Sequence, residues 1–555
     1  MLDLNAPQTA TRHHEGAISL MQRSLKEYAT KGAHLILREL NLQPEQFSSR
    51  TLKKWSLSGS SSEYPDLHGQ KILIWSMRDW SIHVQMETLL GQVLRAHGAE
   101  VVMGTCGGGL EICDRVNTWE GPPMPCRSCT KYVSNSLKSH GLTSERLADG
   151  WGNESFWPEL DLLNLEELRE VEWGGLPLGK LVDIPVKWFL MGESLSEDPL
   201  GTLTYRKFLR SARKIAASAR SIIDTNQPEQ VVLLNGLFLF ESIIIEICRE
   251  RNISFITYER ALMLDTFVFK RNGIAGFYRV DEDWDHFSAI PLSPNERVEL
   301  HEHFTARQTG GGVSDNYWGA ISSASEYSSS GATRAVLFTN LVWDSAVIGQ
   351  DLAFDSIVDW IVASVEEFDR RPSCELIIRV HPAEVKLSGR ESRERMEDAL
   401  RQRIPSLPDN IRLISPEDSV SSYELMESAD FGLVYTSTTG LEMALRGKPV
   451  IVAGKTHYRD RGFTVDVNNR NEFVSAIESQ VDPSTRFTPN VDLAERYAHL
   501  LFFKSAYSDF GLTEPIRGLC KIDPSRVIEA TADPSNDLHK IITTIAARSD
   551  FRVSQ

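Results

Sequence analysis

Residues 429–454 read ADFGLVYTSTTGLEMALRGKPVIVAG, and their pattern is the clearest indication of the fold. The apolar run 429–437 predicts a buried strand, 439–447 has helical spacing with a terminal glycine, and 448–454 is strand-like again. Two short apolar strands joined by a helix are typical of a parallel β-α-β unit. The stretch therefore predicts an open α/β sheet.

The preceding sequence extends the same pattern. It predicts strands at 335–341, 374–382 and 411–416, with a long helix at 354–371. We expect these elements to form one Rossmann-like domain over 335–485, followed by a helical tail over 486–555.

A second set of alternating elements occupies the first half of the chain. KILIWSM (71–77) and AEVVMGTC (99–106) flank a predicted helix at 86–98, and EQVVLLNG (229–236) and ISFITYER (253–260) flank another at 240–252. The predicted organisation is an extension at 1–70, a first domain at 71–308 with a Cys-rich insertion at 104–135, and a Gly- and Ser-rich linker at 309–334.

Composition excludes several classes of protein. The chain has 555 residues, 41% of them hydrophobic and 24% charged, which is typical of a globular protein with more than one core. Its net charge of −17 argues against nucleic acid as a partner. The first residues lack the basic and apolar segments of a secretion signal, and no apolar run has the length of a membrane span, so we expect a cytoplasmic location.

A hydroxyl-rich turn joins the predicted strand at 429–437 to the predicted helix at 439–447. Backbone N–H groups at a helix start can hold a phosphate, and here Ser437, Thr438 and Thr439 add hydroxyl donors while Gly440 permits close approach. Thr439 and Glu442 also have the spacing of a capping box, in which they serve only the helix. The local pattern leaves both interpretations open.

Two further turns follow strands of the same predicted sheet. His381 and Pro382 end one strand, and the segment after Gly454 carries a run of polar and charged residues: Lys455, His457, Tyr458, Arg459 and Arg461. Ligands of open α/β sheets bind outside the carboxyl ends of strands, so these turns are expected at one crevice. An ordinary turn and a solvated loop are the alternatives.

Four ordered motifs together resemble the bacterial capsule polysaccharide biosynthesis proteins. They are NLVWDSAV (340–347), RVHPAE (379–384), the segment 435–454, and HYRDRGFTVD (457–466). That family includes transferases of Kdo, an acidic eight-carbon sugar, and has the GT-B architecture of two Rossmann-like domains facing each other across a cleft. LNGLFLFES (234–242) and TYERALMLDTFVFKRNG (257–273) resemble it less closely.

The resemblance implies roles for individual residues. The C-terminal domain would bind a nucleotide-sugar and the N-terminal domain a carbohydrate or glycolipid acceptor, with association to a membrane export complex left open. CMP-sugars are favoured as donors, with UDP- and GDP-sugars open. The candidate donor-binding residues are Asn340, Pro382, Ser437, Thr438, Thr439, Gly440, Glu442, Lys455, His457, Tyr458 and Arg461. The last four are placed there because they follow a strand of the same sheet, and Asn340 matches the family's entry motif. His381 matches the turn at the donor phosphate, and Trp343 and Asp344 match the motif near the cleft.

Sugar transfer also needs a group that removes a proton from the acceptor hydroxyl. Strand-end candidates in the first half are Asp79, His83, Glu259 and Asp265. We favour Glu259, with a salt bridge to Arg260 as the alternative, and place it with His381 and Asp344 as the candidate catalytic residues. GT-B enzymes generally need no metal for catalysis, and we expect none here.

Four of the seven cysteines cluster in the predicted insertion. Cys106, Cys113, Cys126 and Cys129 have the spacing C-x6-C-x12-C-x2-C, and four thiolates suit a structural zinc ion or an iron–sulfur cluster. Cysteines without a ligand are the alternative.

Two other functions share this fold. A nucleotide-sugar epimerase also has two Rossmann-like domains, and a non-catalytic binding protein would use the insertion for assembly. The capsule-type motifs favour the transferase.

Overall fold

The computed structural model describes residues 50, 52, 65–121, 123–152, 156–193, 195, 199–308, 331–345, 347–387, 389–516 and 518–553. Most of the predicted extension and residues 309–330 of the predicted linker lie outside these. The chain divides into two compact units. Unit 1 comprises residues 1–108, 125–149 and 509–547, and unit 2 comprises 109–124, 150–508 and 548–555. The predicted domain bounds stay predictions.

Unit 1 is built on a parallel β-α-β-α-β run. Its strands are β1 (Lys71–Ser76), β2 (Glu100–Thr105) and β3 (Ser144–Arg146), and its helices are α3 (Ser81–Ala96) and α4 (Cys126–His140). β2 pairs in parallel with both β1 and β3. The apolar side chains of β1 are fully buried, as expected of a strand covered on both faces.

Helix α4 lies partly within the predicted Cys-rich insertion. The helix begins at Cys126, so residues 126–135 of the predicted insertion are helical. Buried residues at Cys129, Tyr132, Val133, Ser136 and Leu137 follow helical spacing, which explains why this segment folds as the crossover between two parallel strands.

The tail, predicted to be helical, contains two strands. β13 (Leu512–Ile516) and β14 (Leu519–Ile522) form an antiparallel pair, followed by α19 (Pro524–Ala532) and α20 (Asp537–Ala546). These elements belong to unit 1, where Gln70 donates a hydrogen bond to the carbonyl of Ala546 at 2.9 Å.

Unit 2 begins with a predominantly helical segment. Its helices are α5 (Leu165–Arg169), α6 (Leu178–Leu181), α7 (Asp183–Leu190) and the long α8 (Pro199–Asn226). They lead to β4 (Gln230–Leu234), α9 (Leu239–Glu250) and β5 (Ser254–Arg260), in which β4 and β5 are parallel. β6 (Phe267–Arg271) then pairs antiparallel with β5.

The second half of unit 2 holds a six-stranded parallel sheet in the order β12-β11-β10-β7-β8-β9. β7 and β10 are far apart along the chain but pair with each other in the middle of the sheet, as in a doubly wound sheet. The strands are β7 (Thr333–Phe338), β8 (Cys374–Arg379), β9 (Ile411–Ile414), β10 (Phe431–Val434), β11 (Val450–Val452) and β12 (Val465–Asp466).

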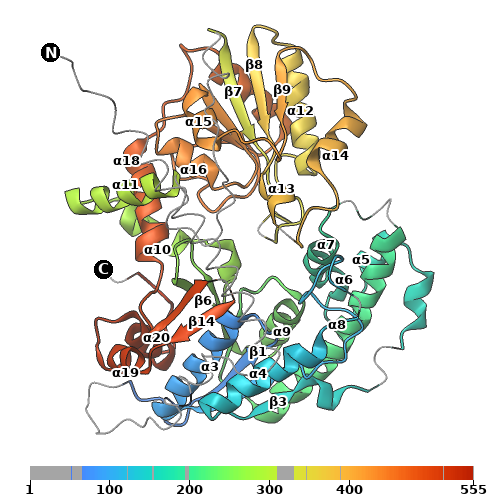
Figure 1. Ribbon diagram of the computed structural model, residues 1–555, viewed down its shortest axis with the longest axis vertical. Coiled ribbons are helices and arrows are strands. Elements are labelled where there is room, and N and C mark those ends of the chain that lie inside the picture. Colours follow the sequence, from blue (N-terminus) through green and yellow to red (C-terminus); the bar gives the residue numbers. More distant parts are fainter. Residues whose placement is uncertain are drawn as a thin grey trace, which may run out of the picture. The chain divides into compact units, whose positions relative to one another are not determined.

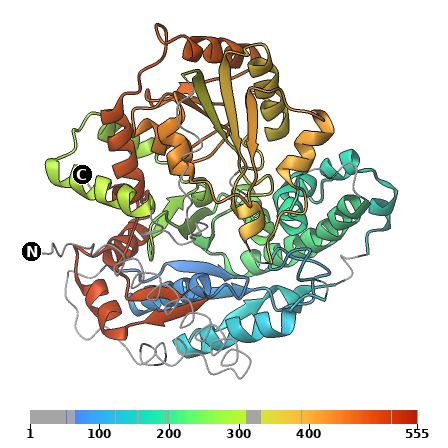
Figure 2. The same ribbon diagram turned by 45° about the horizontal axis from the view of Figure 1, so that its top comes forward.

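Helices cover both faces of this sheet (Figure 1). One core, around Trp360 and Phe368, packs α12 (Ile357–Asp369), α14 (Met396–Arg403) and α17 (Arg470–Val481) against one face. The other core, around Leu441 and Tyr497, packs α15 (Ser422–Ser428), α16 (Thr439–Ala444), α18 (Val491–His499), α10 (Asp281–Ser288) and α11 (Pro294–Gln308) against the other. Figure 2 shows the same sheet and the helices around it from a second direction.

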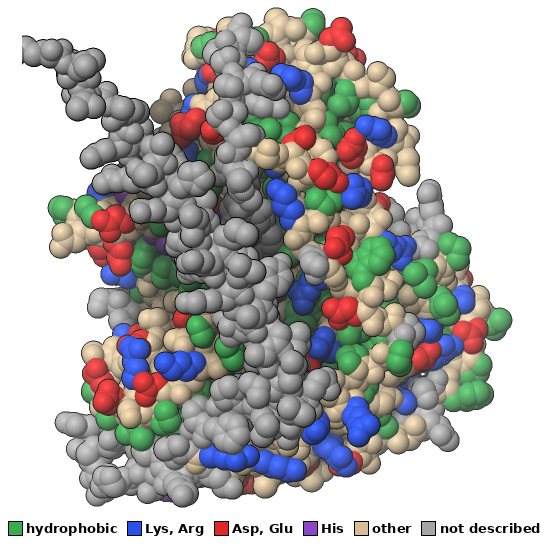
Figure 3. Space-filling view, in the orientation of Figure 1, with side chains coloured by type: hydrophobic (Ala, Val, Ile, Leu, Met, Phe, Trp, Pro, Cys, Tyr) green, Lys and Arg blue, Asp and Glu red, His purple; other side chains and the backbone are tan. Residues whose placement is uncertain are grey.

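These elements confirm the predicted α/β class with two mostly parallel sheets. On the face drawn in Figure 3, the described basic and acidic side chains are interspersed, and no broad basic area is visible among them. Within the described part of the chain, no helix combines the length and apolarity needed to cross a bilayer.

Candidate functional site

Residues Thr339 and Asn340, which follow β7, join the two most specific predicted turns. The backbone N–H of His381 donates to the Thr339 hydroxyl at 3.0 Å, and the backbone N–H of Thr436 donates to Oδ1 of Asn340 at 3.3 Å. β7 lies between β8 and β10, so the turns after all three strands meet at the carboxyl edge of the sheet. The structure therefore brings the His-Pro turn and the hydroxyl-rich turn together.

His381 has a defined hydrogen-bonding state. Its Nδ1 atom accepts the backbone N–H of Ala383 at 3.2 Å, so the proton of the neutral ring lies on Nε2. Burial and the positive charge of Arg379 lower the pKa of His381 to about 4. His381 is therefore a neutral N–H donor at pH 7. Pro382 is buried next to it and precedes the short helix α13 (Ala383–Lys386).

The hydroxyl-rich turn is closed by its own side chains. Ser437 Oγ donates to the Thr439 hydroxyl at 2.8 Å and accepts the backbone N–H of Thr439 at 3.2 Å. Thr438 is the N-cap residue of α16, and its side chain makes no capping hydrogen bond. A Cβ atom at Gly440 would lie 2.3 Å from the hydroxyl of Tyr458, so only glycine fits there.

Glu442 does not complete a capping box. Its Oε1 atom accepts a hydrogen bond from Arg307, on α11, at 3.2 Å, and the residue is only 6% exposed. Burial raises the pKa of the Tyr423 hydroxyl, and the negative charge of Glu442 raises it further. Glu442 therefore links α16 to α11, and sequence spacing gave no sign of Arg307 as its partner.

Of the predicted site residues after β11, Tyr458, His457 and Arg461 contact other elements of unit 2, whereas Lys455 is exposed. Tyr458 is fully buried and donates to the carbonyl of Ser437 at 2.5 Å, which holds the hydroxyl-rich turn from behind. His457 stacks on Tyr497, and burial lowers its pKa to about 3. Arg461 forms an ion pair with Asp281 on α10. Lys455 is exposed, and its backbone N–H donates to the carbonyl of Gln350 at 2.9 Å.

Glu259 lies in β5 and Asp344 lies in the loop after β7, and the charges of both act on Tyr278. Asn235, after β4, donates to Oε2 of Glu259 at 2.9 Å, and the backbone N–H of Arg260 donates to Oε1 at 2.7 Å. Burial raises the pKa of Glu259. The pKa of Tyr278 is raised well above its ordinary value, first by burial and then by the negative charges of Glu259 and Asp344. The charges of both carboxylates therefore act on the Tyr278 hydroxyl, a group that the sequence did not single out.

The structure also describes the other three proton-acceptor candidates. Asp79 and His83 are in unit 1, where Asp79 is buried after β1 and His83 lies in the first turn of α3. Asp265 has a left-handed backbone with φ of 54°, in the turn between β5 and β6. Trp343, next to Asp344, is buried and donates its indole N–H to the Ser392 hydroxyl at 2.7 Å.

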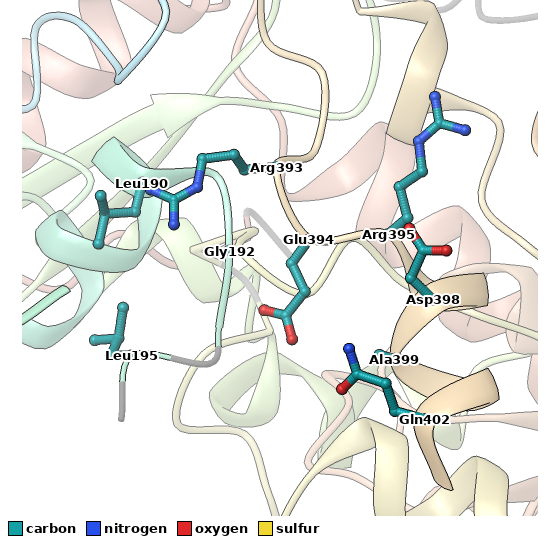
Figure 4. Close-up of a pocket in the computed structure, with 9 residues that line it drawn as sticks. All are labelled: Leu190, Gly192, Leu195, Arg393, Glu394, Arg395, Asp398, Ala399 and Gln402. Carbon is teal, nitrogen blue, oxygen red and sulfur yellow. The ribbon is translucent and has the colours of Figure 1, made fainter. Parts of the chain in front are cut away.

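A polar cavity of about 290 Å³ opens in unit 2 beside the loop that follows the His-Pro turn (Figure 4). Its polar lining comes from Arg393, Glu394, Arg395, Asp398 and Gln402, and in Figure 4 the side chains of Glu394 and Gln402 point toward each other. The loop is fixed to the end of α7, because Glu394 accepts the backbone N–H of Glu193 at 2.9 Å. Carboxylate, amide and guanidinium groups together suit a hydroxyl-rich ligand.

The four clustered cysteines fall in both units. Cys106, Cys126 and Cys129 belong to unit 1, and Cys113 belongs to unit 2. Burial raises the pKa of the Cys106 thiol to about 12. Among the described residues, no group of three or more His, Cys, Asp or Glu side chains has an arrangement that could hold a metal ion. The described residues give no support for zinc, and the metal centre stays a prediction.

The segment that holds the four motifs matches the model of a known protein family. Residues 310–485 match the family model described as capsule polysaccharide biosynthesis protein, which confirms the resemblance over that part of the chain. No curated protein matches the sequence.

Solved structures of sugar-handling enzymes are similar at low identity. The β-Kdo 2,4 transferase KpsC of Thermosulfurimonas dismutans is 16% identical, with 55% of this chain and 88% of that chain covered and a TM-score of 0.35. The UDP-GlcNAc 2-epimerase of Neisseria meningitidis, bound to UDP-GlcNAc, is 11% identical, with 78% and 100% covered and a TM-score of 0.24. The spinosyn rhamnosyltransferase SpnG, complexed with spinosyn aglycone, is 12% identical, with 83% and 100% covered and a TM-score of 0.26.

Proposed function

We propose that this protein is a glycosyltransferase of capsule or surface polysaccharide synthesis, which moves a sugar from a nucleotide-sugar to a carbohydrate or glycolipid acceptor. One observation carries the proposal: Thr339 and Asn340 tie the His-Pro turn and the hydroxyl-rich turn to a single edge of the parallel sheet. This edge lies within the segment that matches the capsule family model. CMP-activated acidic sugars are the donors favoured by the resemblance.

In the proposed mechanism, His381 acts on the donor phosphate. A neutral imidazole with its proton on Nε2 can donate a hydrogen bond to the phosphate oxygens as negative charge develops on the leaving group. Thr438 and Lys455 are further donors at the same edge. Ser437, Thr439, Gly440 and Tyr458 position the turn through their mutual contacts.

Proton removal from the acceptor is assigned to Glu259, with Asp344 as the second carboxylate whose charge acts on Tyr278. Asn235 and the backbone N–H of Arg260 orient the Glu259 carboxylate, and each of its oxygens keeps capacity to accept another hydrogen bond. No step of this mechanism uses a metal ion. The polar cavity beside Glu394 is suited in chemistry to further sugar hydroxyls.

The test has two stages. First, thermal unfolding is measured with a panel of CMP-, UDP- and GDP-sugars, because a ligand that binds only the native state raises the apparent stability. The stabilising donor is then incubated with and without carbohydrate acceptors. Transfer that depends on the acceptor supports the proposal. Conversion of the donor to an isomer without acceptor would identify an epimerase, and binding without turnover would identify a binding protein.

A further inference from the structure

The first turn of α4 carries two cysteines with different exposure. Cys126 is the first residue of this 15-residue helix and is half-buried, whereas Cys129 is buried. The backbone N–H of Cys129 donates to the carbonyl of Pro125 at 3.0 Å, so the turn is closed. Helix geometry places Cα atoms three residues apart at about 5 Å, within the range of about 4.4–6.8 Å that a disulfide spans. The two thiols can therefore be joined with little movement of the backbone.

A glycine loop holds a third thiol against this turn. Cys106 ends β2, and Gly107 and Gly108 follow with φ values of 81° and 88°, which a residue with a side chain rarely adopts. A Cβ atom at Gly108 would lie 3.2 Å from Cβ of Cys126, so the loop passes directly over the helix start. Burial raises the pKa of the Cys106 thiol, and the backbone N–H of Gly108 opposes that rise. The loop thus brings Cys106 next to the pair.

A cavity of about 270 Å³ reaches the cluster from the carboxyl ends of β1 and β2. Cys106 and Cys129 form part of its wall, and its polar lining includes Thr130, Lys131, Ser134 and Arg146. Arg146 also pairs with Asp149. The cavity has room for a small molecule, and its two cations favour one that carries carboxylates.

We propose that Cys126 and Cys129 form a reversible disulfide by exchange with a low-molecular-weight disulfide that carries carboxylates. The thiolate of Cys126, the more exposed of the two, attacks one sulfur of the incoming disulfide, whose S–S bond breaks and releases one thiol. Cys129 then attacks the Cys126 sulfur and releases the second thiol. Two protein thiols are oxidised, the small disulfide is reduced, and the two protons leave on the two released thiols. Cys106 stays a thiol throughout.

The test uses full-length protein, reduced and desalted, then equilibrated with glutathione disulfide at several ratios to reduced glutathione. We expect the seven thiols of the chain to fall by two, with an intact mass lower by two hydrogen atoms and a peptide map joining Cys126 to Cys129. Excess reduced glutathione should restore all seven thiols.

Matched variants separate this exchange from other thiol reactions. Cys129→Ser should stop at a mixed disulfide with one glutathione on Cys126, Cys126→Ser should form no internal disulfide, and Cys106→Ser and the buried Cys374→Ser should oxidise like the parent. Circular dichroism checks that each variant folds. Seven thiols that persist in excess glutathione disulfide, a bond mapped to other cysteines, or a metal ion found on these thiols in purified protein would overturn the proposal.

Discussion

Arg307 donates a hydrogen bond to Oε1 of Glu442 at 3.2 Å, and both side chains are largely buried. We predict that Glu442→Gln lowers the free energy of unfolding by about 1–3 kcal/mol, because the Arg307 guanidinium loses its charged partner. We also expect about 1–2 kcal/mol weaker donor binding, the scale of a lost charge-assisted hydrogen bond to a ribose hydroxyl. Thermal unfolding and calorimetry measure the two effects.

Arg307→Gln is the matched control for Glu442→Gln. It breaks the same ion pair and should cost similar stability, but it leaves the Glu442 carboxylate available and should keep donor affinity. If both variants bind donor as tightly as the parent, Glu442 serves only to join α16 to α11.

His381 offers two atoms with separable roles, since Nδ1 accepts the N–H of Ala383 and Nε2 carries the proton. We predict that His381→Asn, whose amide oxygen can replace Nδ1, keeps the fold but lowers kcat by roughly 100-fold, the cost of one lost donor to developing charge. His381→Gln, which can place an N–H near the Nε2 position, should retain more activity. Equal activity of His381→Asn and the parent would remove His381 from the phosphate site.

The buried carboxyl of Glu384 predicts a pH effect on stability. It is 3% exposed, accepts the backbone N–H of Met396 at 2.8 Å, and has its pKa raised by burial to about 7. Between its ordinary value of 4.5 and about 7 the folded state binds more protons than the unfolded state, so this group makes stability fall as pH rises through that window.

We therefore predict that Glu384→Gln, which keeps the acceptor without the charge, stabilises the protein by about 1–3 kcal/mol at pH 8 and by less at pH 5. Chemical unfolding at both pH values measures the difference. The exposed Glu417, whose pKa is lowered first by the Ser415 hydroxyl, is the control, and Glu417→Gln should give no gain at pH 8. An equal effect of Glu384→Gln at the two pH values would contradict the raised pKa.

The sequence predicted the parallel units because buried strands and amphipathic helices leave local periodic patterns. Most of the predicted elements lie within a few residues of their predicted positions. They include strands β1, β2 and β7 to β11 and helix α16. The pairing of Glu442 with Arg307, separated by 135 positions along the chain, has no local pattern, and the same holds for Asn235 with Glu259 and for Arg461 with Asp281. A capping-box spacing at Thr439 and Glu442 was satisfied in sequence but not in structure, because the buried guanidinium competes for the carboxylate.

The start of α4 at Cys126 is a local feature that the sequence did not predict. Glycines, prolines and cysteines are frequent in residues 106–129 and predicted a loop-rich insertion. The apolar residues Tyr132, Val133 and Leu137 nevertheless bury one side of α4, which begins at Cys126. Composition hid the helix start, because the glycines and prolines just before Cys126 are typical of loops.

The last prediction concerns Glu259 and the base that accepts the proton. Burial raises its pKa, while the hydrogen bonds from Asn235 and the Arg260 backbone favour the charged form. Glu259→Gln should lower kcat by roughly 10²–10⁴-fold, the usual contribution of a general base, and leave donor binding unchanged. Asn235→Ala should keep a working base but raise the pKa of Glu259 further, because one bond to the charged form is lost. The acid limb of kcat/KM, which reports ionisation of the free base, should then move to higher pH.

Asp344→Asn is the matched test of the other carboxylate whose charge acts on Tyr278, and it should keep the acid limb of the parent. If Glu259→Gln stays active and Asp344→Asn abolishes transfer with its donor affinity intact, the base is Asp344, and Glu259 with Asn235 only shapes the end of β5.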